Sequence, residues 1–176
     1  MNLKKYLPPI VFLFLLQIGC AQIPAERPPL KNGQFDKKLT QMLRFSVPII
    51  GVEELYNIQN EVHIFDTREW SEYQVSHIKG AQYLGYDQFD ATRLQELPKD
   101  TKIVLYCSVG YRSEKIGERL QKMGYTNVYN LYGSIFEWAN QGKEMLDSQG
   151  QPTKQLHTYN KNWSRWVEPG KAEKIW

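Results

Sequence analysis

The chain has 176 residues, of which 41% are hydrophobic and 13% are aromatic, which suits one packed domain with extensions and excludes a disordered chain. Its formal net charge of +3 includes Lys4 and Lys5, which lie in a segment that we expect to be removed. Without them the charge is close to neutral, and with no cluster of Lys or Arg this argues against a nucleic-acid partner.

Residues 1–19 are predicted to be a signal peptide, because two lysines precede an apolar run that is too short to span a bilayer. The run ends in Gln17-Ile18-Gly19-Cys20, which resembles a bacterial lipobox, although Leu is usual where Gln17 stands. We therefore expect export to the bacterial cell envelope or periplasm and membrane anchoring through a lipid on Cys20. Ordinary secretion with cleavage before Gln22, or a retained hydrophobic anchor, are the alternatives.

Residues 20–42 are predicted to be a spacer and a short helix that precede the domain. Three prolines lie between residues 21 and 33, where apolar periodicity is weak. Apolar residues then recur at helical spacing between residues 35 and 45.

Strands and helices are predicted to alternate between residues 43 and 142, with connections too long for hairpins. This pattern predicts an α/β fold with a mostly parallel central sheet of about five strands and helices on both faces. The apolar runs at 62–65 and 103–106 are typical of strands covered on both faces. The predicted strands are 49–50, 62–65, 82–84, 103–106 and 127–131, and the predicted helices are 52–60, 70–75, 87–95, 113–123 and 135–140; a turn is predicted at 77–81.

Residues 143–176 form a predicted C-terminal extension in which Tyr159, Trp163, Trp166 and Trp176 stand among charged residues. Because isolated exposed aromatic side chains are disfavoured, we expect these four to pack against the domain. The alternative is that they bind a protein partner.

Cys107 is the candidate nucleophile, because it lies at the carboxyl end of the strand 103–106, where ligands bind in open parallel sheets. Unsatisfied backbone N–H groups there and at the start of the following helix can hold a sulfur anion, and the charge of Arg112 favours the thiolate. Gly110 can take the positive φ that such a loop needs. An inert buried cysteine is the alternative. The backbone cradle is predicted to comprise Ser108, Val109, Gly110, Tyr111, Arg112 and Ser113.

The segment 107–113, Cys-Ser-Val-Gly-Tyr-Arg-Ser, resembles the CxxGxRS active loop of single-domain rhodanese-like sulfurtransferases. Other pieces between residues 47 and 142 are similar to the same family, and Ser134 stands where the family usually has a second glycine. We expect that difference to matter little. The other matching pieces are Asp66-Thr67-Arg68-Glu69, His77-Ile78-Lys79-Gly80-Ala81, Met123-Gly124-Tyr125, Asn127-Val128-Tyr129-Asn130-Leu131, and Gly133 with Trp138.

The resemblance implies that Cys107 takes the outer sulfur of thiosulfate or a related donor as a persulfide, and that a thiol or cyanide then accepts it. Arg112 would attract the anionic donor, and Tyr111 would shape the rim. Four residues separate Cys107 from Arg112, one fewer than in the related phosphatases, which favours sulfur over phosphate. The alternatives are a catalytically idle binding module and, less favoured, a phosphatase of the same fold.

The remaining ionisable residues are predicted to be supporting or structural. Arg112 could instead form a structural ion pair. Asp66 and Arg68 are possible supporting residues, and Asp66 with Glu69 resembles a helix capping box. His77 is expected to orient backbone. Neither His63 nor His157 has a ligand spacing with Cys107, so we expect no metal ion and no cofactor.

Overall fold

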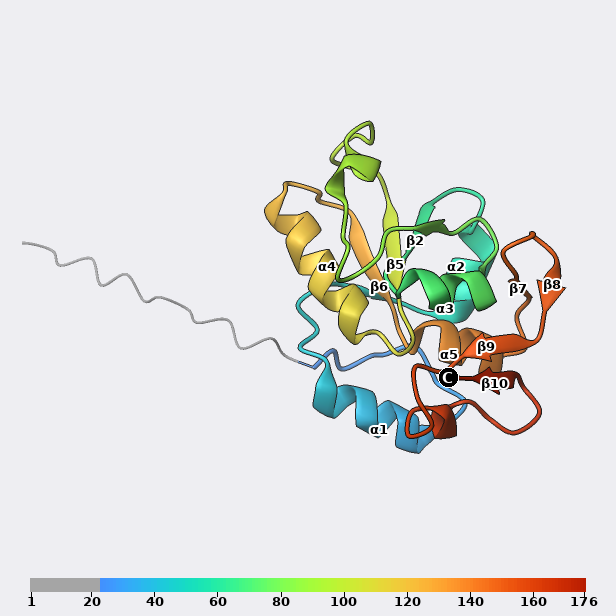
Figure 1. The fold of residues 1–176 in the computed structure, drawn as a ribbon. Helices are drawn as coiled ribbons and strands as arrows, with labels where there is room; N and C mark the ends of the chain where they lie inside the picture. Colours follow the sequence, from blue (N-terminus) through green and yellow to red (C-terminus); the bar gives the residue numbers. More distant parts are fainter. Residues whose placement is uncertain (1–22) are drawn as a thin grey trace, which may run out of the picture.

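The computed structural model describes residues 23–176 (Figure 1). The predicted signal peptide and the predicted lipidation site Cys20 lie outside the described residues. Within residues 23–176, no helix combines the length and the apolar character needed to cross a bilayer.

A parallel five-stranded sheet forms the centre of the molecule, as the alternation of elements predicts. Its strand order is β1-β6-β5-β2-β4, and every neighbouring pair is parallel. The central strand β5 is buried along its whole length, which explains its continuous apolar sequence. The strands are β1 (Ile49–Ile50), β2 (His63–Asp66), β4 (Gln82–Tyr83), β5 (Ile103–Tyr106) and β6 (Val128–Leu131).

Helices cover both faces of this sheet. Alternate residues of β5 point to opposite sides, so Val104 packs with α2 (Val52–Ile58) and α5 (Ser134–Asn140) in one cluster. Leu105 packs with α4 (Tyr111–Lys122) in the other cluster. The predicted fold class is therefore confirmed.

The helix predicted at 87–95 is wrong. Only one 3₁₀ turn, η1 (Ala91–Leu94), forms there. Asp90 accepts the N–H of Thr92 with its side chain, which offers the backbone an alternative to a helix. Leu94 is the one buried residue of the turn, so no apolar stripe holds a longer helix on the core.

α1 (Gly33–Met42) belongs to the same core as the sheet, although it precedes the predicted domain. Phe35 and Leu39 of this helix are fully buried in the main cluster. Asp36 accepts a hydrogen bond from the Tyr132 hydroxyl at 2.7 Å. The helix begins after Asn32, whose side chain accepts two N–H groups of the first turn.

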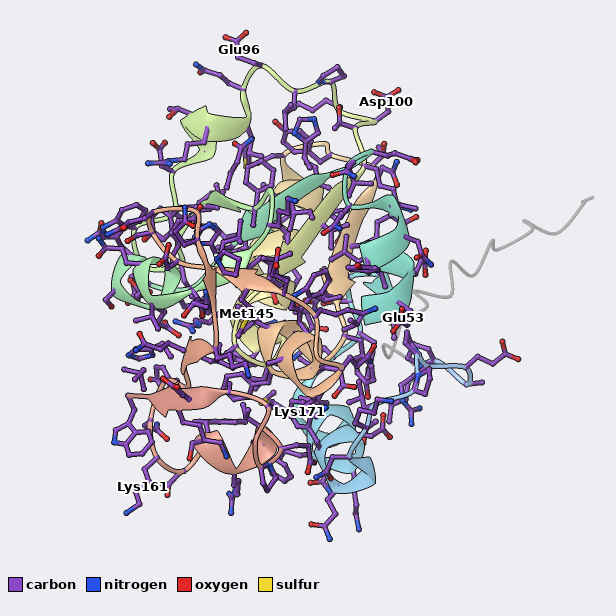
Figure 2. All side chains as sticks on the ribbon, turned by 90° about the vertical axis from the view of Figure 1, so that its right-hand side faces the viewer. Glu53, Glu96, Asp100, Met145, Lys161 and Lys171 are labelled. Atoms are coloured by element: carbon purple, nitrogen blue, oxygen red, sulfur yellow. The ribbon has the colours of Figure 1, made fainter. Side chains whose placement is uncertain are left out.

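The C-terminal extension is ordered and packs along α1 and α5 (Figure 1). Residues 77–78, predicted as part of a turn, instead form β3 (His77–Ile78), which pairs with β7 (Met145–Leu146), and β7 pairs with β8 (Pro152–Thr153). β9 (Gln155–His157) pairs in parallel with β10 (Glu173–Ile175), and η2 (Ser164–Trp166) lies between them. Figure 2 shows Met145 within the molecule and Lys161 pointing outward from the extension.

The predicted packing of the aromatic side chains is confirmed for two of the four. Trp166 stacks on Phe35 with ring centroids 5.5 Å apart, and Trp163 packs against the main core. Tyr159 is 55% exposed, although one side of its ring lies against Arg112 of the domain. For Trp176, which is 59% exposed, the prediction is wrong. The extension therefore leaves two large rings on the surface.

Candidate functional site

Cys107 follows β5 directly, and its side chain is only 2% exposed. Its backbone N–H donates to Ser134 Oγ at 3.2 Å, and its carbonyl accepts the N–H of Ile135 at 3.2 Å. These bonds attach the cysteine to the start of α5. Ser134 adopts a positive φ of 53°, which a glycine would also allow, but its hydroxyl adds a hydrogen-bond acceptor for Cys107 that a glycine lacks.

The cradle, residues 108–113, follows Cys107 directly and bends back to its sulfur. The N–H of Gly110 donates to Sγ at 3.1 Å, and the φ of Gly110 is 111°, a value that side chains rarely tolerate. Gly110 is also the N-cap of α4, which is why this helix begins at Tyr111, two residues before the predicted start. The first N–H groups of this helix have no acceptor within the helix, and the loop that carries Cys107 leads directly into this end of α4.

Asn130 fixes the shape of the cradle from the neighbouring strand β6. Its side chain is fully buried, donates to the carbonyl of Gly110 at 3.0 Å and accepts from the Ser113 hydroxyl at 2.7 Å. Sequence reasoning placed residue 130 in a matching motif but gave it no role. An amide side chain within a buried strand could have indicated its role, because a buried amide needs hydrogen-bond partners.

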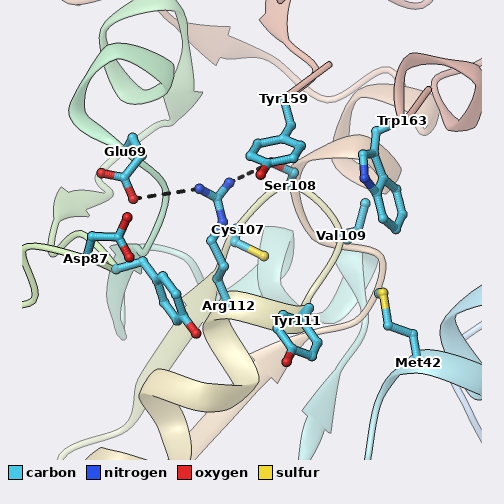
Figure 3. A pocket seen from close by; sticks show the side chains of 11 residues that line it. Met42, Glu69, Asp87, Cys107, Ser108, Val109, Tyr111, Arg112, Tyr159 and Trp163 are labelled. Atoms are coloured by element: carbon cyan, nitrogen blue, oxygen red, sulfur yellow. Dashed lines mark hydrogen bonds and ion pairs between the residues drawn. The ribbon is translucent and has the colours of Figure 1, made fainter. Parts of the chain in front are cut away.

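Arg112 forms a two-pronged ion pair with Glu72 of α3 (Trp70–Val75), at 2.6 and 2.8 Å. The Ser108 hydroxyl joins this pair: it donates to Glu72 at 3.1 Å and accepts from Arg112 at 3.0 Å. Glu69 lies 3.9 Å from Arg112, also on the side of α3 (Figure 3). The structural ion pair considered for Arg112 is therefore present.

Glu72 is the main residue that sequence reasoning missed. It is 2% exposed, and its pKa is lowered: burial raises it, but the hydrogen bond and charge of Arg112 outweigh burial. Glu72 also forms a capping box with Glu69, the N-cap of α3. The spacing of these two glutamates was the available signal.

The pKa of the Cys107 thiol is lowered by its surroundings. Burial by itself raises this pKa, but the charge of Arg112 and hydrogen bonds from Ser113 and Gly110 together outweigh burial. Since the Ser113 hydroxyl donates its one proton to Asn130, the N–H groups are the donors that remain for sulfur. The site therefore favours a thiolate, which is the nucleophilic form.

Asp66 and Arg68 form a fully buried ion pair that does not line the pocket beside Cys107. Arg68 also donates to the carbonyl of Ser76, which ties β2 to the end of α3. The predicted capping box of Asp66 with Glu69 is wrong, because Arg68 occupies the carboxylate of Asp66.

The three histidines lie apart from the sulfur. His77 stacks on Tyr73 at 4.1 Å, with Nδ1 3.3 Å from the carbonyl of that tyrosine, and His63 stacks on Phe65. His157 comes nearest the site: its Nδ1 is 3.9 Å from Glu72 and accepts the N–H of Tyr159. Across residues 23–176, no three metal-binding side chains are grouped as a metal site requires.

A pocket of about 500 Å³ opens beside Cys107. The cradle forms its floor, and side chains from α1, from the domain and from the C-terminal extension surround it (Figure 3). Tyr111 is at its edge, 44% exposed, in agreement with a rim position. The lining residues are Met42, Glu69, Tyr86, Asp87, Cys107, Ser108, Val109, Tyr111, Arg112, Tyr159 and Trp163.

Residues 51–141 match the sequence profile of the Rhodanese-like domain family. Two similar curated proteins are tRNA uridine(34) hydroxylases. The one from Erwinia tasmaniensis is 37% identical over 89 residues, which are 48% of this chain and 25% of that protein. The one from Bdellovibrio bacteriovorus is 37% identical over 79 residues, 43% of this chain and 23% of that protein. The chain thus spans about a quarter of the length of these relatives.

Solved structures show the same fold. The Rhodanese-like domain of an Anabaena protein aligns with a TM-score of 0.53 at 21% identity, over 57% of this chain and 79% of that chain. A thiosulfate sulfurtransferase from Pseudomonas aeruginosa aligns with a TM-score of 0.53 at 20% identity, over 69% of this chain and 23% of that chain. At these identities the likeness concerns the fold alone.

Proposed function

Because this chain belongs to the rhodanese-like domain family, we propose that it is a sulfurtransferase that moves sulfane sulfur through a persulfide on Cys107. The donor is thiosulfate or a related molecule, and the acceptor is a thiophile. One observation carries the proposal: the N–H of Gly110 donates to Sγ at 3.1 Å in a loop at the start of α4, where the first N–H groups have no acceptor within the helix and can bind a sulfur anion.

In the first half-reaction, the Cys107 thiolate attacks the outer sulfur of thiosulfate. A bond forms between Sγ and that sulfur, the sulfur–sulfur bond of thiosulfate breaks, and sulfite leaves with its electron pair. In the second half-reaction, cyanide or a thiolate attacks the outer sulfur of the persulfide. The electron pair of the broken bond returns to Sγ, so the free thiolate is restored and no outside oxidant or reductant is needed.

Arg112 supports this mechanism chiefly through its charge beside Cys107. Its charge favours the thiolate, as the lowered pKa of Cys107 indicates, and by the same attraction it favours the persulfide anion of the proposed intermediate. Its guanidinium is already bound by Glu72, so its attraction for an anionic donor is weakened by the neighbouring carboxylate. The buried pair keeps the guanidinium at a fixed place beside the cradle.

The alternatives receive less support. A phosphatase of this fold needs a wider cradle, whereas four residues separate Cys107 from Arg112 here. A catalytically idle binding module has no need of a thiol with a lowered pKa inside a hydrogen-bonded loop. The hydroxylase activity named for the relatives belongs to proteins about four times as long as the matched segment, so it does not outweigh the local chemistry.

Intact mass spectrometry tests the proposal. The purified protein is incubated with thiosulfate, and a gain of one sulfur atom is expected, together with thiocyanate when cyanide is added. Cys107→Ala should show neither. If no sulfane donor produces the adduct on the native protein, the proposal is wrong.

We also propose that the protein is exported to the bacterial cell envelope and anchored through a lipid on Cys20. The support is the charged and apolar sequence of residues 1–19 and the lipobox-like residues that follow. Fatty-acid labelling in a bacterial host should label the native protein and not Cys20→Ala. Equal labelling of both would contradict the anchor.

A further inference from the structure

The pocket beside Cys107 is wider than a small inorganic anion requires. Its volume of about 500 Å³ is typical of sites that bind small organic molecules. One side of it consists of Met42, Tyr159 and Trp163, which we name the aromatic wall. Met42 comes from α1 and the two rings from the C-terminal extension, so all three lie outside the family segment 51–141.

The aromatic wall is held in place by its own segment. Tyr159 has a φ of 65°, a conformation that non-glycine residues rarely adopt and that occurs often at functional sites. The N–H of Tyr159 donates to His157 Nδ1 at 3.2 Å. The centroid of the Tyr159 ring lies 5.5 Å from the Arg112 guanidinium. The N–H of Trp163 bonds to Asn160, while its ring packs on the core and faces the pocket (Figure 3).

The charges around the pocket disfavour an acceptor that carries an anionic group besides its reacting sulfur. Glu69 and Asp87 line it, and Glu72, outside the lining, pairs with Arg112 at 2.6 Å. Arg112 is the one cation among the lining residues of the described chain, and its guanidinium is already paired with Glu72. Lys38 lies outside the lining, 5.9 Å from the centroid of the Trp163 ring.

We propose that the sulfur acceptor is an organic thiol with an apolar, preferably aromatic body and no carboxylate, and that this body rests on the aromatic wall. The inference rests on the sulfurtransferase activity proposed above. The acceptor thiol loses its proton to solvent, and its sulfur forms a bond to the outer sulfur of the persulfide. The bond from that sulfur to Cys107 Sγ breaks, Sγ keeps the electron pair, and the acceptor leaves as a persulfide.

Two matched acceptors test the chemical class. The Cys107 persulfide is formed with saturating thiosulfate and then offered either benzyl mercaptan or 4-(mercaptomethyl)benzoate, which differ by one distant carboxylate. The kcat/KM for benzyl mercaptan should be higher by about tenfold, and the difference should shrink at high salt. Equal values, or a preference for the carboxylate, would overturn the inference.

Variants of the aromatic wall test its location. Tyr159→Asn tolerates the positive φ but removes the ring, and Trp163→Leu keeps apolar bulk. Each should lower the ratio of kcat/KM for benzyl mercaptan to that for cyanide by about tenfold, mainly through KM, because stacking area is lost. Tyr159→Phe keeps the ring, so this variant should have the same ratio as the native protein. The ratio cancels any loss of folded protein.

A variant outside the pocket provides the matched control. Trp176→Ala removes an exposed ring from the same extension and should leave the ratio unchanged. If it lowers the ratio as much as Tyr159→Asn does, the location is wrong. If the native protein forms no persulfide with any donor, the proposed function fails, whereas a persulfide that passes to cyanide without favouring benzyl mercaptan contradicts only the acceptor class.

Discussion

The cradle and the aromatic wall face the same pocket but are built in different ways. The cradle lies within the family segment and is fixed by buried polar groups, chiefly Asn130 and the Glu72–Arg112 pair. The wall comes from segments on either side of that domain, and one of its rings is mostly exposed. If the two proposals above hold, the chemistry of sulfur binding depends on a hydrogen-bonded network, and the choice of acceptor depends on side chains at the surface.

The largest expected effect is the loss of the nucleophile. Cys107→Ser keeps the size of the side chain in the cradle but removes the thiolate, so thiocyanate formation should fall by about a thousandfold or more. A cyanide assay measures it, and the melting temperature should stay near that of the native protein. Substantial remaining activity would show that sulfur is carried elsewhere.

Breaking the largely buried pair of Glu72 with Arg112 should cost the most stability. Glu72→Ala leaves the Arg112 guanidinium without its partner, and the free energy of unfolding should fall by about 3–5 kcal/mol. Chemical denaturation measures it. The matched control is Glu53→Ala, since Glu53 pairs with Lys143 but is 67% exposed, and its loss should cost about 0–1 kcal/mol. Similar losses for both variants would show that the Glu72–Arg112 pair stabilises the protein no more than a surface ion pair does.

The backbone of the cradle should also resist change. Gly110→Ala places a side chain at a φ of 111°, which should cost about 1–3 kcal/mol and move the N–H away from the sulfur. Gly33→Ala, at a helical position where an added Cβ meets nothing within 4 Å, is the control and should be neutral or slightly stabilising. Equal melting temperatures for the two variants would contradict a strained loop.

The pH dependence follows from the two lowered pKa values. Because the pKa of Cys107 is lowered, its alkylation should stay fast below the ordinary thiol value and slow only as the pH falls through the lower pKa. The double variant Glu72→Gln with Arg112→Gln removes the cation without leaving a lone charge, and should move this profile to higher pH. An unchanged profile would mean that Arg112 does not favour the thiolate.

The lowered pKa of Glu72 predicts that the stability of the protein also decreases as the pH falls. The pKa of Glu72 is lowered from 4.5, so its stabilising contribution is fully present above pH 4.5 and is lost as the pH falls through the lower folded value. Melting temperatures measured across this acidic range should fall more steeply for the native protein than for Glu72→Gln.

The smallest effect is expected at the aromatic wall. Tyr159→Asn removes an exposed ring while keeping a residue that accepts positive φ, so the free energy of unfolding should change by less than about 0.5 kcal/mol. Chemical denaturation of Tyr159→Asn and Glu72→Ala under the same conditions measures the difference in stability between the wall and the cradle. A loss of several kcal/mol would show that the wall is part of the structural network.

The sequence by itself determined the parallel sheet, the place of Cys107 at the end of β5 and the cradle that follows. These features depend on local patterns: continuous apolar runs, a glycine able to take positive φ, and residues contiguous in the chain. The helix at 87–95 failed because Asp90 offers a local backbone alternative that apolar spacing does not report.

Only the tertiary structure decided which distant residues meet around Arg112 and Cys107. Glu72 lies 40 residues from Arg112, and Tyr159 lies still farther from Cys107 along the chain, so no spacing rule connects them. Packing brought α1 and the extension to the carboxyl edge of the sheet, because their apolar side chains complete its core. Packing between distant segments thus determined the walls of the pocket, whereas the cradle at its floor follows from one short stretch of sequence.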